Sequence, residues 1–207
     1  MLLSPVLLQS CSKDGPQDTA YYHVGDFYPD KNVVYNNGTL ISGVAAEGVV
    51  FWVDPADATG RSGKALSLEY FQGKWAADGA STVQTSLTDE GDGAVNIQTL
   101  QAFIAGSDYL WSDFPIFNWV YNDLNGGAAS PWYIPAHTEA TGLHTSYSRY
   151  KTLINSKLSS VLGITLPPFD DGSVWSSTEW SYDSAYTWSG ATPDKNNTCY
   201  AIAIRKF

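Results

Sequence analysis

Tyrosine, tryptophan, serine, aspartate and asparagine gather in the segment 180–197, which reads W-S-Y-D-S-A-Y-T-W-S-G-A-T-P-D-K-N-N. These residue types build recognition surfaces, because rigid aromatic rings supply contact area and short polar groups supply hydrogen bonds. The segment therefore predicts a surface that binds a glycan or a protein. We expect this surface to consist of Trp180, Tyr182, Asp183, Tyr186, Trp188, Asp194, Asn196 and Asn197. The alternative is that the aromatic rings pack into the core, and we expect half of them to be buried.

The five residues before this segment form the most distinctive string in the chain, W-S-S-T-E. They are Trp175, Ser176, Ser177, Thr178 and Glu179. We expect the tryptophan to be buried, the three hydroxyl groups to satisfy backbone groups in a tight turn, and the glutamate to accept hydrogen bonds from them. The string is therefore interpreted as a structural motif that holds the 180–197 segment in place.

The sequence holds no arrangement of residues that is typical of catalysis. Ser177 has no histidine downstream, and the chain lacks a glycine-rich phosphate loop, a Cys/His cluster and an isolated pair of carboxylates. We therefore expect a protein that is not an enzyme.

Two groups of residues invite a metal interpretation. His137 and His144 flank Glu139, but the spacing of the two histidines does not match a zinc site. The run 89–93, D-E-G-D-G, offers carboxylates to calcium, but it lacks the EF-hand order, and Leu100 stands where the bidentate glutamate would belong. We expect no metal and no cofactor, and we keep calcium as a minor alternative.

The composition excludes one class of partner and favours a β-containing fold. The chain has 207 residues, of which 14% are aromatic and only 15% are charged, with 18 glycines. This balance favours a loop-rich, β-containing fold over a helical bundle. The formal net charge of -10 argues against nucleic acid as a partner, because phosphate binding needs a basic face.

The N-terminus resembles a truncated lipoprotein signal. An apolar stretch over residues 1–8 leads into Leu8-Gln9-Ser10-Cys11, which resembles a bacterial lipobox whose cysteine is lipidated. The stretch is too short to span a bilayer and lacks a basic start, so we expect a late start codon or a truncation. Residues 12–20 are typical of a flexible tether. We therefore expect a surface-exposed outer-membrane lipoprotein of the cell envelope, which contacts the membrane only through a lipid on Cys11.

Residues 21–207 are expected to form a single domain that follows the signal and tether over 1–20. Apolar runs and alternation predict the strands, and apolar residues at helical spacing predict the helices. The strands are predicted over 21–28, 48–53, 64–69 and 199–207, and the helices over 96–104, 113–125 and 146–162. We expect the strands at 48–53 and 64–69 to form a hairpin. W-S-S-T-E, the segment after it and the last strand are expected to form one antiparallel unit, with Cys199 buried.

The order of these elements resembles a known family. The blocks that carry the resemblance are G-V-V-F-W-V-D from Gly48, K-A-L-S-L from Lys64, W-Y-I-P from Trp132, I-N-S-K-L from Ile154, W-S-S-T-E, and the closing Y-A-I-A-I-R-K-F from Tyr200. Over about residues 21–207 the chain resembles the C-type-lectin-like domain family of unknown function found in surface lipoproteins of Bacteroides-type bacteria. The resemblance implies an α+β fold in which two helices flank a small antiparallel sheet. It also implies that the two terminal strands pair and that a long loop region precedes the last strands.

The chain departs from this family's relatives in ways that bear on function. It lacks the Glu-Pro-Asn or Gln-Pro-Asp and Trp-Asn-Asp tripeptides of calcium-dependent lectins, and it lacks the paired disulfides of animal lectins. Calcium-dependent sugar binding therefore does not follow from the resemblance. Ala136 stands where the family often has serine, three positions before Glu139, which leaves the start of a helix there undecided.

The sequence thus leads to one main functional hypothesis and two alternatives. The main hypothesis is a surface-anchored recognition or adhesion module that binds a glycan or a protein through its C-terminal loop face. The first alternative is a structural subunit of a fimbria or of the cell envelope, in which the aromatic residues form core. The second is a ligand-binding variable protein diversified by retroelement mutagenesis.

Overall fold

The computed structural model describes residues 22–29, 35–36, 39–40, 45–128, 131–167, 169 and 173–207 and shows an α+β fold. Cys11 and the tether over 12–20 lie outside the described residues, so the lipid anchor stays a prediction. Among the described residues, no helix is both long enough and apolar enough to cross a membrane.

The main sheet has four antiparallel strands in the order β1-β4-β5-β8. Their bounds are Phe27–Tyr28 for β1, Gly48–Val53 for β4, Gly63–Lys74 for β5 and Thr198–Lys206 for β8. The predicted β4–β5 hairpin is confirmed, with Val49 opposite Leu66. A separate two-stranded sheet joins β2, Tyr35–Asn36, to β3, Thr39–Leu40.

The predicted pairing of the terminal strands is wrong. Strand β5 pairs with β4 on one edge and with β8 on the other, so β1 and β8 lie at opposite edges of the sheet. The two ends of the domain meet through aromatic rings instead. Phe207 stacks on Tyr28 at a centroid distance of 5.0 Å and contacts the ring of Tyr22 at 4.7 Å.

The first two predicted helices are present with different bounds. Helix α1 spans Gly93–Ala105 and begins three residues before the predicted start, because the Asp92 side chain accepts the Ala94 N–H and caps it. The single helix predicted over 113–125 is divided into three parts. These are a 3₁₀ turn over Trp111–Asp113, the short helix α2 over Pro115–Asn118, and a π-helical turn over Trp119–Leu124.

Helix α3 spans His137–Leu162 and is nine residues longer at its start than the predicted 146–162. Ala136 offers no capping hydroxyl, but Thr178 Oγ1 accepts the His137 N–H at 2.9 Å and takes over that role. Glu139 turns back to accept the Ala136 N–H at 3.2 Å. The helix ends at Gly163, whose φ of 70° suits a glycine stop.

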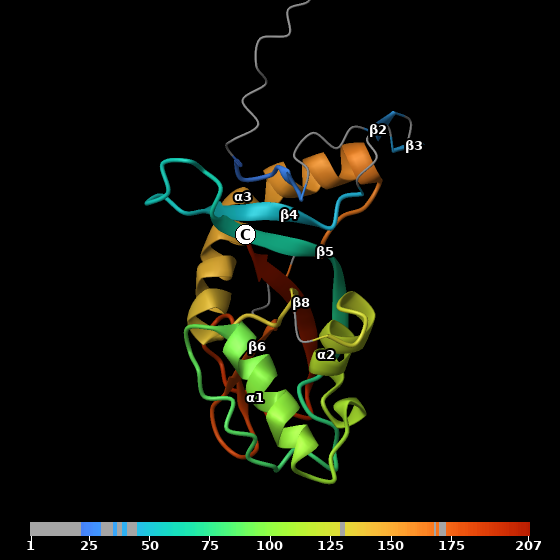
Figure 1. The fold of residues 1–207 in the computed structure, drawn as a ribbon, viewed down its shortest axis with the longest axis vertical. Helices are drawn as coiled ribbons and strands as arrows, with labels where there is room; N and C mark the ends of the chain where they lie inside the picture. The colour runs from blue at the N-terminus through green and yellow to red at the C-terminus, as the bar shows by residue number, and fades with distance from the viewer. Residues whose placement is uncertain are drawn as a thin grey trace, which may run out of the picture.

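W-S-S-T-E forms strand β6, Trp175–Glu179, which pairs antiparallel with β7, Ala185–Thr187. Strand β8 belongs to the main sheet, and its Tyr200 forms an isolated bridge with Val174, the residue before β6. The expected single antiparallel unit is therefore two units. Figure 1 shows α1 beside β6 at one end of the domain and α3 passing the β4–β5 hairpin at the other.

Candidate functional site

The β6–β7 hairpin presents the predicted recognition segment. Its turn is closed by the Ser184 carbonyl, which accepts the N–H groups of Trp180 and Ser181 at 3.0 and 3.1 Å. At this turn, Trp180 is 59% exposed and Tyr182 is 57% exposed, although both side chains are large and apolar. The turn therefore carries two exposed rings, and their part in a binding surface stays a prediction.

The four aromatic residues of the segment do not share one environment. Trp180 packs edge-on against Tyr186 at 5.2 Å, and the half-buried Tyr186 ring stacks on His137 at 4.1 Å. Trp188 is only 1% exposed. It lies against His144 at 4.7 Å and meets the ring of Phe169 edge-on at 5.5 Å. Its placement in the binding surface is wrong, because its ring packs under α3 as part of the core.

The polar residues of the segment lie at a shallow hollow of about 160 Å³. Its lining is Asp183, Asp194 and Asn196 with Ser81 and Thr82. The hydrogen bond from Ser181 Oγ, 2.6 Å long, is the main reason that the pKa of Asp183 is lowered. Asn197 is exposed just beyond, and its N–H donates to the Asp194 carbonyl. The structure therefore brings the two aspartates and Asn196 together at one hollow, which the Trp180 and Tyr186 rings do not line.

Lys195, within the same segment, is completely buried. Its ammonium group donates to the carbonyls of Val83 and Tyr182 at 2.9 and 2.8 Å and forms an ion pair with Glu179. It also lies 4.9 Å from the centre of the Trp75 ring. Burial lowers the pKa of Lys195, while the Glu179 carboxylate opposes that effect. Sequence reasoning missed this residue because a lysine between Asp194 and Asn196 carries no local signal of burial.

Glu179 accepts hydrogen bonds, as predicted, but the predicted donors are wrong. Its carboxylate accepts the N–H groups of Thr85 and Ser86, each at 3.0 Å, as well as Lys195, and not the hydroxyls of its own string. The five residues lie in an extended strand and not in a tight turn, so their side chains reach neighbouring segments. The glutamate therefore ties the hairpin to the loop before α1.

The three hydroxyl groups of W-S-S-T-E do satisfy polar groups. Ser176 Oγ accepts the Thr178 N–H within the string at 3.3 Å, and the other partners lie on other elements. Ser176 Oγ donates to the Tyr186 carbonyl at 3.0 Å, and Ser177 Oγ accepts from Asn96 Nδ2 at 2.9 Å. Thr178 Oγ1 donates to the Asp89 carbonyl at 2.8 Å. All five residues are buried, Trp175 included, which fits a structural motif that supports the exposed turn.

Neither group of residues considered for a metal gathers into a site. In the D-E-G-D-G run, Asp89 Oδ1 accepts the N–H groups of Gly91 and Asp92, and Asp92 accepts from the Ala94 N–H and Lys206 Nζ. Glu139 accepts from Lys64 Nζ and the Tyr133 hydroxyl, while His137 stacks on Tyr186. Within the part of the chain that the structure describes, no three histidine, cysteine, aspartate or glutamate side chains cluster in a way that could hold a metal ion.

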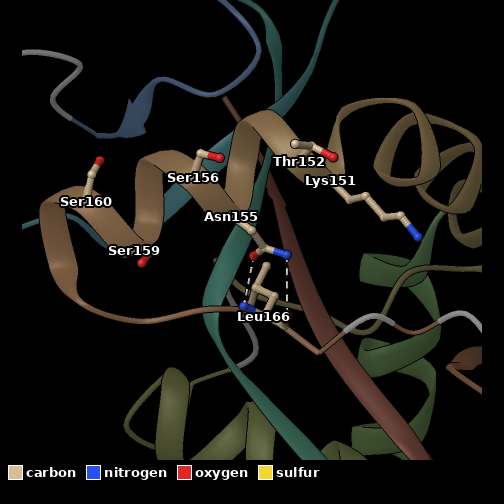
Figure 2. Close-up of a pocket in the computed structure, with 7 residues that line it drawn as sticks. All are labelled: Lys151, Thr152, Asn155, Ser156, Ser159, Ser160 and Leu166. Atoms are coloured by element: carbon tan, nitrogen blue, oxygen red, sulfur yellow. Dashed lines mark hydrogen bonds between the residues drawn. The ribbon is translucent and has the colours of Figure 1, made fainter.

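A larger hollow of about 680 Å³ runs along the second half of α3 (Figure 2). It is lined by Lys151, Thr152, Asn155, Ser156, Ser159, Ser160 and Leu166. Asn155 uses its amide to bind the backbone N–H of Leu166 at 3.0 Å, which fixes the chain after the helix. Figure 2 shows the hydroxyl groups spread along successive turns and not gathered around one point, so this hollow lacks a focused site.

Comparison with known proteins shows the fold and not the family. No protein-family model and no curated protein matches the chain. Its structure is similar to the crystal structure of a fimbrial protein from Bacteroides ovatus, with a TM-score of 0.55 and 22% sequence identity. The match covers 90% of this chain and 49% of that one, so the chain spans about half the length of the protein it resembles. The C-type-lectin-like resemblance stays a prediction.

Proposed function

We propose that this protein is a structural subunit of a fimbria-like assembly on a bacterial cell surface. The observation that carries the proposal is the fold that nearly the whole chain shares with a fimbrial protein. The lipobox-like sequence ending at Cys11 supports the same location in the cell envelope. The proposal assigns the domain an assembly role and includes no catalytic step.

The interior of the domain supports a structural role. Strand β6 is buried along its whole length, and its side chains bond the loop at 85–89, α1, α3 and β7. Such a fully satisfied polar network specifies one packing of the surrounding elements. A subunit that must keep its shape between neighbours benefits from this kind of interior.

Immunogold electron microscopy of the organism that encodes the chain tests this role. An antibody to the full-length protein should label filaments on the cell surface, and a strain that lacks the gene should lose both the label and the filaments. Labelling confined to the cytoplasm would contradict the proposal. Labelling of the envelope in cells whose filaments carry no gold and persist without the gene would contradict it as well.

A second candidate function is recognition of a glycan or protein through the hairpin turn. The specific observation in its favour is that Trp180 and Tyr182 are exposed on the turn that also carries Asp183, one of the residues that line the polar hollow. A glycan array probed with the full-length protein tests this candidate, with and without calcium. Selective glycan binding that is lost in a Trp180→Ser, Tyr182→Ser variant supports it, and a blank array counts against the glycan form.

A further inference from the structure

A second concave site lies between β4 and α3, away from the β6–β7 hairpin. It is a pocket of about 470 Å³ between the end of β4, Phe51–Val53, and the first half of α3. This volume falls in the range of pockets that bind small molecules. Figure 1 shows α3 passing this end of the β4–β5 hairpin. We call this site the β4–α3 pocket.

The walls of the β4–α3 pocket are mainly aromatic. Tyr22, Trp52 and Tyr150 all line it. Trp52 is 36% exposed and also lines a neighbouring hollow of about 330 Å³, and Lys64 Nζ lies 5.8 Å from the centre of its ring. An exposed tryptophan that lines a pocket offers apolar surface to the C–H groups of a ligand, which is how aromatic-lined pockets supply affinity.

One face of α3 supplies the polar groups. Ser146, Arg149 and Tyr150 stand at i, i+3 and i+4, so they share one side of the helix, and all three line the pocket. Within the described residues, neither the Arg149 guanidinium nor the Ser146 hydroxyl has a hydrogen-bond or ion-pair partner; Arg149 only lies over the Tyr150 ring at 5.2 Å. Their donors are therefore available to a ligand.

Among the described residues, Arg149 and Arg61 have no ion pair, whereas most other lysine and arginine side chains do. Ion pairs occupy the side chains of Lys64, Lys74, Lys157, Lys195, Arg205 and Lys206. The chain carries a net charge of -10, yet the one carboxylate that lines the pocket, Asp54, accepts the Ala56 N–H at 2.8 Å. An arginine left open beside aromatic walls favours an anionic group that it can bind with two parallel hydrogen bonds.

We propose that the β4–α3 pocket binds a carboxylated sugar, a hexuronic acid residue. The Arg149 guanidinium binds the carboxylate, the Ser146 hydroxyl bonds a ring hydroxyl, and the Trp52 ring covers the C–H face of the sugar. A pocket of about 470 Å³ has room for one sugar ring. This binding is separate from the assembly role proposed above and does not depend on it.

Isothermal titration calorimetry of the full-length protein with sodium D-glucuronate tests the proposal. D-Glucose and sodium acetate are the matched probes, because glucose lacks the carboxylate and acetate lacks the ring. We expect glucuronate to bind and each control to bind about tenfold or more weakly. Equal affinity for acetate identifies a simple anion site and overturns the proposal, as does equal affinity for glucose or no binding of glucuronate.

Variants assign the binding to this pocket. Arg149→Gln and Trp52→Leu should each weaken glucuronate binding about tenfold or more, since one removes the charge-assisted bond and the other the stacking surface. Arg61→Gln is the control, because it removes the same charge from an exposed residue that does not line the pocket. Equal weakening by the two arginine variants overturns the assignment, as does tight binding of an oligoglutamate peptide that glucuronate cannot displace.

Discussion

The Lys195 ammonium and the Glu179 carboxylate form an ion pair that is closed to solvent, with 0% and 2% of their side chains exposed. Glu179 is the last residue of β6, and Lys195 lies in the loop that leads to β8. Lys195 also bonds the Tyr182 carbonyl at the hairpin turn. The pair therefore fixes the exposed turn against the body of the domain.

Removal of one partner should be costly, because the other charge stays buried without compensation. We expect Lys195→Met to lower the free energy of unfolding by about 3–5 kcal/mol, measured by urea denaturation. The control is Lys74→Met, which breaks a pair with Asp78 whose two side chains are 35% and 75% exposed, and it should cost about 1 kcal/mol at most. Equal losses in the two variants would show that burial adds nothing to the pair.

The parts of the fold with local signals could be predicted from the sequence. The β4–β5 hairpin follows from an apolar run that ends at Asp54-Pro55 and from a second run after a glycine loop. The start of α3 could not be predicted in this way. Its cap comes from Thr178, 41 positions further along the chain, and no pattern around Ala136 reveals it.

In the candidate site too, only features with a local sequence signal could be predicted. The composition of the 180–197 segment correctly indicated exposed rings at Trp180 and Tyr182. The composition did not show that Trp188 is buried, because the identity of a tryptophan does not indicate whether its ring faces the core or the solvent. The β4–α3 pocket was missed entirely, since it joins β4 to a helix that follows it by more than 80 residues.

Two glycines should respond to alanine in opposite directions. A Cβ at Gly93, the first residue of α1, would lie 2.1 Å from the Ile134 carbonyl oxygen, and backbone cannot move aside cheaply. We expect Gly93→Ala to lower the free energy of unfolding by about 3 kcal/mol. Gly142 lies within α3 with open space around it, so Gly142→Ala should raise stability by up to about 1 kcal/mol. Thermal denaturation of both variants checks the prediction, which fails if both changes have the same sign.

The Asp92–Lys206 contact should make stability depend on pH in the acid range. Burial raises the pKa of Asp92, but the hydrogen bonds from Lys206 and the Ala94 N–H outweigh it and hold the pKa below its ordinary value of 3.8. The folded state therefore binds this proton less readily than the unfolded chain does. The stabilisation is complete above pH 3.8 and is lost as the pH falls through the pKa of the folded state.

Asp92→Asn isolates this effect, because asparagine caps a helix about as well as aspartate but does not titrate. Urea denaturation between about pH 6 and pH 2.5 should show that the wild-type protein is more stable than Asp92→Asn near pH 6. The difference in the free energy of unfolding between the two proteins should shrink as the pH falls. A difference that stays constant over this range would mean that the Asp92 carboxylate makes no pH-dependent contribution.

The exposed turn should matter for assembly and not for folding. Trp180 and Tyr182 are more than half exposed, so replacing both with serine removes little buried area and should change stability by about 0.5 kcal/mol or less per residue. In a fimbria-like assembly, two exposed rings on a rigid turn are the kind of surface that a neighbouring subunit covers.

Cells that produce Trp180→Ser, Tyr182→Ser should therefore contain folded protein but show less gold label on filaments than wild-type cells. Ser189→Ala, a change at another exposed residue of the same segment, is the control. Wild-type labelling of filaments by the double variant would exclude the turn as an assembly contact.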